Sequence, residues 1–236
     1  DNYISAPDMG TTEYDIQHIY EFNSKMLGTG THARGGVGRE ENQGGIPIDD
    51  WELTAHGLVA AINTLENMDS GIYVKGAHVV IQGYGNVGAP TASKLNAKGA
   101  IIVGASDINA GLWNQEGLHI EQLNSTRNTP GGLSNYNGKT LRRFQPNQVD
   151  WLLEAPCDIL IPAARPDAIT ARNADRIQCK VILQGANTPI NKMTEYYLSN
   201  RRKIHSLSDF VVNSGGIIGC AVELKMKAEK EYEKKV

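Results

Sequence analysis

The sequence of 236 residues has few cysteines, no long apolar run and no strong excess of charge of either sign. Its three cysteines, Cys157, Cys179 and Cys220, are not spaced like metal ligands, and an odd number argues against a disulfide framework. We therefore expect reduced thiols in a cytoplasmic protein, with no metal site. No apolar run is long enough to span a bilayer, so no membrane partner is expected. The formal net charge of −3 disfavours a nucleic-acid binder, which is usually basic.

The composition is that of a globular protein, with 40% hydrophobic and 21% charged residues. The length suffices for one large α/β domain or two small ones. The chain does not begin with methionine, and its first residues read like the interior of a protein. We therefore expect it to be part of a longer polypeptide.

The most informative segment is an apolar run that leads into a glycine-rich turn, Val79-Val80-Ile81-Gln82-Gly83-Tyr84-Gly85-Asn86-Val87-Gly88. In such a Gly-x-Gly-x-x-Gly pattern, Gly83 permits a tight turn out of a strand and Gly85 lets the backbone approach a diphosphate. Gly88 lets the following helix pack closely, with its first amides directed at the anion. An ordinary strand, turn and helix is the alternative, but the surrounding sequence favours a dinucleotide-binding loop.

An acidic residue follows at the spacing expected for such a loop. A second apolar run, Ile101 to Ala105, leads to Asp107, which lies 19 positions after Gly88. A carboxylate about 20 residues after the glycines accepts hydrogen bonds from the adenosine ribose in NAD-binding domains. Asp107 would also repel the 2′-phosphate of NADP, and no Arg or Lys follows before Arg127. The sequence therefore favours NAD over NADP.

Strand-like and helical segments alternate along the chain, which predicts an α/β fold: a doubly wound, Rossmann-like sheet, mostly parallel, with flanking helices. Residues 107–150 are predicted to form an elaborated crossover with a helix near Ile120 and a short hairpin. The expected strands cover residues 79–82, 101–105, 158–162, 180–184, 203–206 and 210–212. Other helices are expected over residues 16–27, 89–98 and 217–232. A further helix, capped by Asp49 or Asp50, is expected to carry Leu58, Ala61, Ile62, Leu65 and Met68.

Three turns of small residues follow expected strands, and they suggest a pocket for a flat ring. They are Pro162-Ala163-Ala164, Gly185-Ala186-Asn187 and Asn213-Ser214-Gly215-Gly216. Ligands of open parallel sheets bind beyond the carboxyl ends of the strands, and the amides of Asn187 and Asn213 suit a carboxamide. Simple tight turns are the alternative for each one singly, because Asn and Gly favour turns. Together with the glycine loop, they predict a nicotinamide pocket.

These motifs and several others resemble, nearly from end to end, the NAD(P)-binding domain of the glutamate/leucine/phenylalanine/valine dehydrogenases. The resemblance implies one dinucleotide-binding domain over residues 1–236, with 1–50 and 215–236 as hinge or substrate-side elements. The additional motifs are Ala6-Pro7-Asp8-Met9-Gly10-Thr11, Gly35-Gly36-Val37-Gly38-Arg39-Glu40, Leu53-Thr54-Ala55-His56-Gly57, Cys157-Asp158-Ile159-Leu160-Ile161 before Pro162, and Gln184 to Pro189.

The resemblance implies NAD(P)-dependent oxidative deamination of an L-amino acid to a 2-oxo acid and ammonium, in a homo-oligomeric protein. Asp8 matches the acid that moves protons to and from the amino nitrogen, a task suited to a positioned carboxylate. Arg39 and Thr54 match positions near the nicotinamide, with a surface cation and a helix-start hydroxyl as the alternatives. The implied cofactor contacts further include Gly83, Gly85, Asn86, Val87, Gly88, Asp107, Ala163, Ala164, Asn187 and Asn213.

The chain also departs from the family pattern. The catalytic lysine and the substrate domain of the family are not matched, so we expect this chain alone to bind cofactor without turnover. The segment from Asn42 to Glu52 is longer than the usual join and is a lid, a contact surface or a neutral insertion. Cys220 stands where glutamate enzymes have a substrate-contacting Ser and branched-chain enzymes an apolar residue.

Three functions therefore stay open. The Pro7-Asp8 pair resembles glutamate dehydrogenases, whereas Gly219 to Leu224 ends like the leucine enzymes. The chain is accordingly the cofactor domain of a glutamate dehydrogenase-like enzyme, of a leucine or branched-chain dehydrogenase, or a stand-alone NAD-binding module without catalysis.

Overall fold

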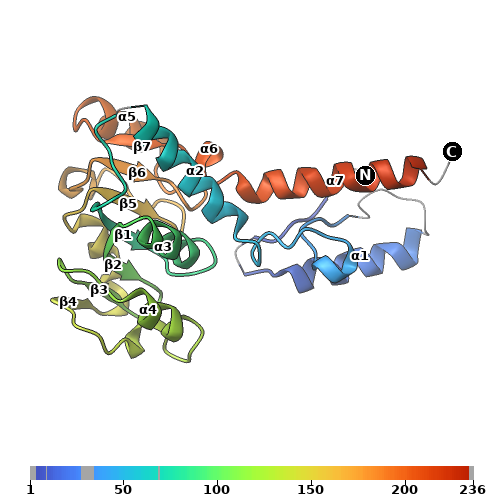
Figure 1. Ribbon diagram of the computed structural model, residues 1–236, viewed down its shortest axis with the longest axis horizontal. Coiled ribbons are helices and arrows are strands. Elements are labelled where there is room, and N and C mark those ends of the chain that lie inside the picture. The colour runs from blue at the N-terminus through green and yellow to red at the C-terminus, as the bar shows by residue number, and fades with distance from the viewer. Residues whose placement is uncertain (1–3, 9, 28–34, 69, 234–236) are drawn as a thin grey trace. The chain divides into compact units, whose positions relative to one another are not determined.

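The computed structural model describes residues 4–8, 10–27, 35–68 and 70–233, with the backbone alone at 27, 43 and 227–233 (Figure 1). The chain divides into two compact units. Unit 2 comprises Thr54–Asn213, and unit 1 comprises Asp1–Leu53 together with Ser214–Val236. The single dinucleotide-binding domain over residues 1–236, with 1–50 and 215–236 as hinge or substrate-side elements, stays a prediction.

Unit 2 is built on a seven-stranded sheet with the order β4-β3-β2-β1-β5-β6-β7. The β2–β1, β1–β5, β5–β6 and β6–β7 pairs are parallel, and the β2–β3 and β3–β4 pairs are antiparallel. The direction of winding reverses between β1 and β5, which creates a crevice at their carboxyl ends. The strands are β1 (His78–Gln82), β2 (Ile101–Ser106), β3 (Gly111–Trp113), β4 (Arg142–Phe144), β5 (Ile159–Pro162), β6 (Val181–Leu183) and β7 (His205–Leu207).

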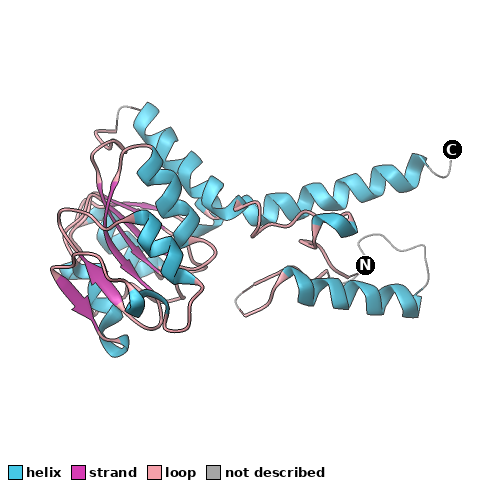
Figure 2. Ribbon diagram, turned by 60° about the horizontal axis from the view of Figure 1, so that its bottom comes forward, coloured by secondary structure: helices cyan, strands magenta, loops and turns pink. Residues whose placement is uncertain are grey.

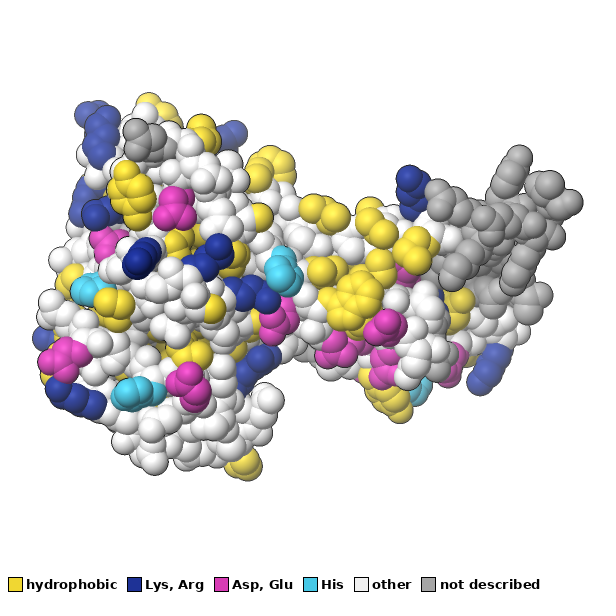
Figure 3. All heavy atoms as spheres, in the orientation of Figure 1, with side chains coloured by type: hydrophobic (Ala, Val, Ile, Leu, Met, Phe, Trp, Pro, Cys, Tyr) yellow, Lys and Arg dark blue, Asp and Glu magenta, His cyan; other side chains and the backbone are white. Residues whose placement is uncertain are grey.

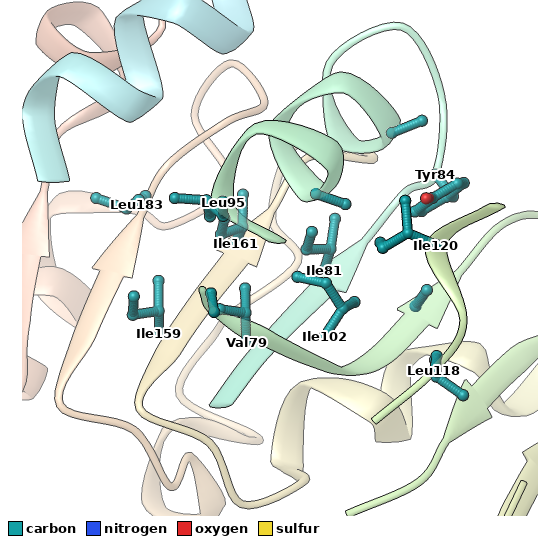
Figure 4. Packing of buried hydrophobic residues seen from close by; sticks show 14 of the residues in the cluster. Val79, Ile81, Tyr84, Leu95, Ile102, Leu118, Ile120, Ile159, Ile161 and Leu183 are labelled. Atoms are coloured by element: carbon teal, nitrogen blue, oxygen red, sulfur yellow. The ribbon is translucent and has the colours of Figure 1, made fainter. Parts of the chain in front are cut away.

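The two faces of the sheet are covered by different helices, because successive side chains of a strand point to opposite faces. Val79 and Ile81 face α2 (Leu53–Asn67), α3 (Gly88–Ala97) and α4 (Ile120–Arg127). In Figure 4, Leu95 of α3 lies against this face beside Ile161. Val80 belongs to the opposite face, which is covered by η3 (Pro146–Glu154), η4 (Ala174–Arg176) and α5 (Lys192–Asn200). Helices on both faces confirm the predicted doubly wound α/β fold (Figure 2).

The crossover over residues 107–150 contains β3, α4, η2 (Gly132–Asn135) and β4. The predicted helix begins at Ile120, and β3 and β4 form an antiparallel pair. The crossover thus widens the sheet beyond β2.

One predicted strand is wrong. Phe210 and Val211 lie in a short helix, α6 (Asp209–Val212), and their side chains are 78% and 60% exposed. The amides of Val211 and Val212 donate to the Ser208 carbonyl, which closes a helical turn. The apolar composition of residues 210–212 predicted a strand, but the hydrogen bonds to the Ser208 carbonyl fold this segment into a helical turn.

Unit 1 contains α1 (Glu13–Leu27), η1 (Glu41–Gln43) and α7 (Gly215–Glu233). The sequence places Ile217 on one apolar stripe of this helix with Ala221, Leu224, Ala228 and Tyr232. In the structure Ile217 is 66% exposed, whereas Cys220 and Glu223 of the same helix are buried. No helix in the described part of the chain combines the length and apolar character needed to cross a bilayer.

Candidate cofactor-binding site

The glycine loop after β1 has the backbone geometry that its sequence predicts. Gly83 has φ +94°, and a Cβ on it would lie 2.8 Å from the Ala164 Cα. A Cβ on Gly88 would lie 1.9 Å from the Gly83 carbonyl oxygen, so only glycine allows α3 to start this close to the turn. A Cβ on Gly85 would meet no atom within 4 Å. Packing therefore requires two of the glycines, and the third faces open space.

A cavity of about 610 Å³ lies over this loop, entirely within unit 2. It sits at the carboxyl ends of β1, β2 and β5, where the winding of the sheet reverses, and its size suits a small organic ligand. Its walls are Gln82–Asn86, Ser106–Asn109, Arg127–Asn128, Val149–Asp150 and Ala163–Arg165. A second cavity, of about 620 Å³ beside Trp113 and Trp151, includes none of these turns.

Helix α4 holds the glycine loop from the side. The Tyr84 hydroxyl donates to Asn124 Oδ1 at 2.8 Å, and Asn124 Nδ2 donates to Ser93 Oγ of α3 at 3.1 Å. Burial raises the pKa of Tyr84 well above its usual range, so this phenol stays a donor. Arg127, at the end of α4, donates to the Asn86 side-chain oxygen. The loop is thus held in place by Asn124 and Arg127 of α4, which lie outside the glycine motif.

Asp107 lies at the cavity, as predicted, but its carboxylate already has partners. Asp107 Oδ1 accepts from the amides of Asn109 and Ala110, both at 2.8 Å. Asp107 Oδ2 accepts from the Leu133 amide at 2.7 Å. These bonds close the turn between β2 and β3 and anchor η2. The carboxylate therefore has a role in the fold in addition to the contact with ribose, which stays a prediction.

The sequence interpretation missed a polar group on the cavity wall. Gln82, the last residue of β1, donates from Nε2 to Asp150 Oδ1 at 2.6 Å. Arg165, after β5, donates to Asp150 Oδ2, also at 2.6 Å. In the sequence, only Gln82 could have been recognised, because it is a polar residue at the end of an apolar strand. Asp150 and Arg165 belong to no motif.

The three small-residue turns have different surroundings within unit 2. Ala163 and Ala164 line the cavity beside the glycine loop. Asn213 Nδ2 donates to Asn187 Oδ1 at 2.9 Å, and more weakly to the Gly185 carbonyl at 3.5 Å. The turns after β6 and α6 are therefore joined to each other, and the contacts of Asn187 and Asn213 with a carboxamide stay predictions. Thr54 is half-buried in the first turn of α2.

In unit 1, Asp8 lies in an exposed turn. Its amide donates to Thr11 Oγ1 at 2.8 Å, and its carbonyl accepts from the Thr11 amide at 3.0 Å. The preceding Pro7 packs on Gly38, where a Cβ would lie 2.7 Å from the Pro7 Cδ. The position of this carboxylate is therefore tied to the glycine-rich segment, and its catalytic role stays a prediction.

Arg39 is buried inside unit 1, with 1% of its surface exposed. Its Nε and NH2 groups both lie 3.2 Å from Glu223 Oε1, and its guanidinium lies 3.8 Å from the centre of the Tyr20 ring. Its predicted contact near the nicotinamide is untested. The observed contacts show that Arg39 serves the packing of unit 1.

Cys220 is 3% exposed and packs in an apolar cluster with Val37. Burial raises the pKa of its thiol to about 11, so the group stays neutral at physiological pH. In this setting the thiol acts as a small apolar side chain. Its contact with substrate stays a prediction.

Acidic and basic side chains are interspersed on the face drawn in Figure 3. Among the residues that Figure 3 colours, the Lys and Arg side chains do not form one continuous basic field of the kind that binds a nucleic-acid backbone.

Comparisons with known proteins agree with this geometry. A family model described as Glutamate/Leucine/Phenylalanine/Valine dehydrogenase matches residues 44–235. The chain is 33% identical over 222 residues to an NADP-specific glutamate dehydrogenase of Saccharolobus shibatae, covering 93% of this chain and 50% of that protein. It is also 33% identical over 223 residues to a cryptic catabolic NAD-specific glutamate dehydrogenase of Bacillus subtilis, covering 91% and 48%. The chain therefore spans about half the length of these relatives.

Solved structures show the same fold. A hetero-hexameric glutamate dehydrogenase from Thermus thermophilus superposes with a TM-score of 0.80 at 23% identity, over 96% of this chain and 51% of that one. Glutamate dehydrogenase 2 of Plasmodium falciparum gives a TM-score of 0.75 at 26% identity, over 96% and 50%. These findings confirm the resemblance and the fold that the sequence predicts.

Proposed function

The chain belongs to the glutamate/leucine/phenylalanine/valine dehydrogenase family, and from this we propose that its unit 2 binds the NAD(P) cofactor of an amino-acid dehydrogenase. One observation carries the proposal. Gly83 and Gly88 are tightly packed, whereas Gly85 faces open space in a loop that lines the 610 Å³ cavity. This cavity lies where the winding of the sheet reverses. Helix α3 begins at Gly88, directly after the loop, and its N-terminus suits a diphosphate because the helix dipole favours an anion there.

For the whole protein we propose oxidative deamination of an L-amino acid to a 2-oxo acid and ammonium. The bound cofactor would supply the acceptor for the hydride from the substrate Cα. Asp8 would exchange a proton with the amino nitrogen, a role that its exposure in unit 1 permits. L-glutamate is the proposed substrate, because the relatives reported above are named glutamate dehydrogenases; the leucine-like Gly219 to Leu224 segment keeps a branched-chain amino acid as the alternative.

The proposal includes a limit on this chain. Catalysis in the family depends on a lysine that has no match here, so the isolated 236 residues would bind cofactor without turnover. Robust glutamate-dependent reduction of NAD by the isolated chain would contradict this limit.

The choice of cofactor rests on two side chains of the cavity wall. Asp107 places a carboxylate at the end of β2, and we propose NAD as the preferred cofactor because this charge opposes a 2′-phosphate. Arg127 lines the same cavity and is the nearby cation that could offset that effect. Asp107→Ala should therefore bring the affinities for NADH and NADPH closer together, and Arg127→Ala should weaken NADPH more than NADH. Unchanged affinity ratios in both variants would remove the argument.

The test of the proposal is a titration of the chain with NADH, followed by cofactor fluorescence. We expect saturable binding by the natural sequence and a loss of at least about tenfold in affinity for Gly85→Val, whose side chain would occupy the space proposed for the diphosphate. Because that side chain would enter open space in the free protein, the thermal unfolding of Gly85→Val should stay close to that of the natural sequence. Absence of NADH binding by the natural sequence would refute the proposal.

We also propose that the full-length protein is a cytoplasmic homo-oligomer. The Thermus thermophilus relative is named hetero-hexameric, which supports an oligomer but not identical subunits; the identity of the subunits is proposed from the family resemblance alone. Sedimentation of the full-length protein would test it, and a monomer at micromolar concentration would contradict it.

A further inference from the structure

The inference concerns Gln82, which stands in the glycine-loop motif just before Gly83 and has no role assigned above. Its side chain is 2% exposed at the end of β1, and the residue forms part of the wall of the 610 Å³ cavity. Its Nε2 donates to Asp150, whereas its Oε1 has no hydrogen-bond partner among the described residues. A buried carbonyl oxygen without a donor is unfavourable and is uncommon in folded proteins.

The orientation of this amide is set by chemistry. An ionised carboxylate only accepts hydrogen bonds, so the NH2 group of Gln82 has to face Asp150. Asp150 is itself held on its other oxygen by Arg165. Arg165 and Asp150 thus form an ion pair behind the amide, and the carbonyl oxygen of Gln82 stays turned away from both.

A hydrogen-bond donor on a ligand in the cavity that Gln82 lines would give this oxygen a partner. The oxygens of a diphosphate at the glycine loop are acceptors and would be repelled by it. The nearest donors on a dinucleotide are the ribose hydroxyls that flank the diphosphate. The amide therefore suits a ribose better than a phosphate.

The position of the hydrogen-bonded group formed by Gln82, Asp150 and Arg165 indicates which ribose of the dinucleotide, adenosine or nicotinamide, is closer. Asp107, at the end of β2, lies on the side that the adenosine ribose occupies in such domains. Arg165 follows β5, on the other side of β1 in the sheet order. We propose that Gln82 Oε1 accepts a hydrogen bond from a hydroxyl of the nicotinamide ribose, and that Asp150 and Arg165 position the amide for it. This inference rests on the proposed binding of NAD(P).

The experiment compares three ligands by calorimetry on the whole chain: NADH, ADP-ribose and ADP. The first two carry the second ribose, and ADP lacks it. Gln82→Met should lose about tenfold in affinity for NADH and for ADP-ribose, the effect of one hydrogen bond, and should bind ADP as the natural sequence does.

The matched control is Gln184→Met. Gln184 is 2% exposed at the end of the neighbouring strand β6, but its amide is bonded to Glu195 and Ser206 and it does not line the cavity. This variant should leave the ratio of the three affinities unchanged. A second variant, Asp150→Asn, replaces one acceptor oxygen by an NH2 donor, so the orientation of the Gln82 amide is no longer fixed. It should weaken NADH and ADP-ribose in the same pattern, which provides a test if Gln82→Met does not fold.

The outcomes separate the two proposals. If the natural sequence binds none of the three ligands, the proposed function fails. If it binds them and Gln82→Met weakens all three equally, or none of them, the ribose contact is refuted while the proposed function stands.

Discussion

At the scale of the residue, the buried charges of unit 1 hold its loops together. Glu223 Oε2 accepts from the amides of Gly38 at 2.8 Å and Ile46 at 2.9 Å, while Oε1 pairs with Arg39. One carboxylate thus connects α7 to both ends of the segment over residues 38–46. Glu223 binds the Gly38 amide, and Pro7, which precedes Asp8, packs on Gly38. The Arg39–Glu223 ion pair therefore also helps to position Asp8.

Removing one partner of this ion pair should destabilise unit 1. Glu223→Gln leaves the Arg39 cation buried without its counter-charge, and we expect a loss of about 3 kcal/mol in the free energy of unfolding. The measurement is urea unfolding followed by tryptophan fluorescence in a background with Trp113 and Trp151 replaced by Phe, so that only Trp51 of unit 1 reports.

The control for this prediction is Glu116→Gln. Glu116 pairs with Lys139 at the surface, with side chains 70% and 64% exposed, so its loss should change stability by less than about 0.5 kcal/mol. Equal effects of the two substitutions would show that burial of the Arg39–Glu223 pair has no energetic consequence.

At the scale of the element, the start of the central strands depends on one acidic residue. Asp158 accepts from the His78 amide at 2.9 Å and pairs with Lys180 at 2.8 Å, so it joins the beginnings of β1, β5 and β6. Partial burial alone would raise the pKa of Asp158, but the bonds from Lys180 and His78 outweigh it and lower the pKa below its usual value of 3.8. The carboxylate form is therefore favoured by folding.

The sign of the pH dependence follows from this shift. A lowered pKa in the folded state contributes stability that is present above the unfolded value and is lost as the pH falls through the folded one. At pH 7 the free energy of unfolding of Asp158→Asn should therefore be lower than that of the natural sequence by roughly 1 kcal/mol. This is the difference between a hydrogen bond to an ionised group and one to the neutral amide that replaces it. Denaturant unfolding between pH 7 and pH 2 should show this difference shrinking below pH 3.8.

A companion variant, Lys180→Met, keeps the His78 bond and removes the cation. The loss of stability on the acid side should then be smaller than in the natural sequence and should be complete at a higher pH, because the folded-state pKa of Asp158 lies closer to its unfolded value. The proposed role of Asp158 would be contradicted if the difference in unfolding free energy between Asp158→Asn and the natural sequence stayed constant down to pH 2.

Element boundaries also show where local sequence signals fail. The run of β-branched residues around Val211 predicted a strand, and the structure has a helical turn with two exposed apolar side chains. By contrast, the glycine loop was predicted in detail, because its geometry depends on glycine itself: Gly83 adopts a positive φ and Gly88 meets a carbonyl.

At the scale of the whole molecule, cofactor binding should be linked to folding. A ligand that binds only the folded state stabilises it by about 2.7 kcal/mol at a concentration 100 times its Kd. NADH at that excess should slow amide hydrogen exchange in β1 and the glycine loop, and should raise the unfolding temperature. Gly85→Val at the same NADH concentration should show neither effect; equal stabilisation of both proteins would indicate that NADH acts elsewhere.

The sequence by itself determined the parallel sheet, the order of the motifs and the dinucleotide loop, because hydrophobic periodicity and glycine conformation act within short stretches of chain. Only the tertiary structure decided the partners of the polar groups. Arg39 meets Glu223 across 184 positions and Gln82 meets Asp150 across 68, and no local pattern carries such pairings. For the same reason, the hydrogen bonds of the Asp107 carboxylate, and the Gln82 oxygen that has no partner among the described residues, became visible only in the folded chain.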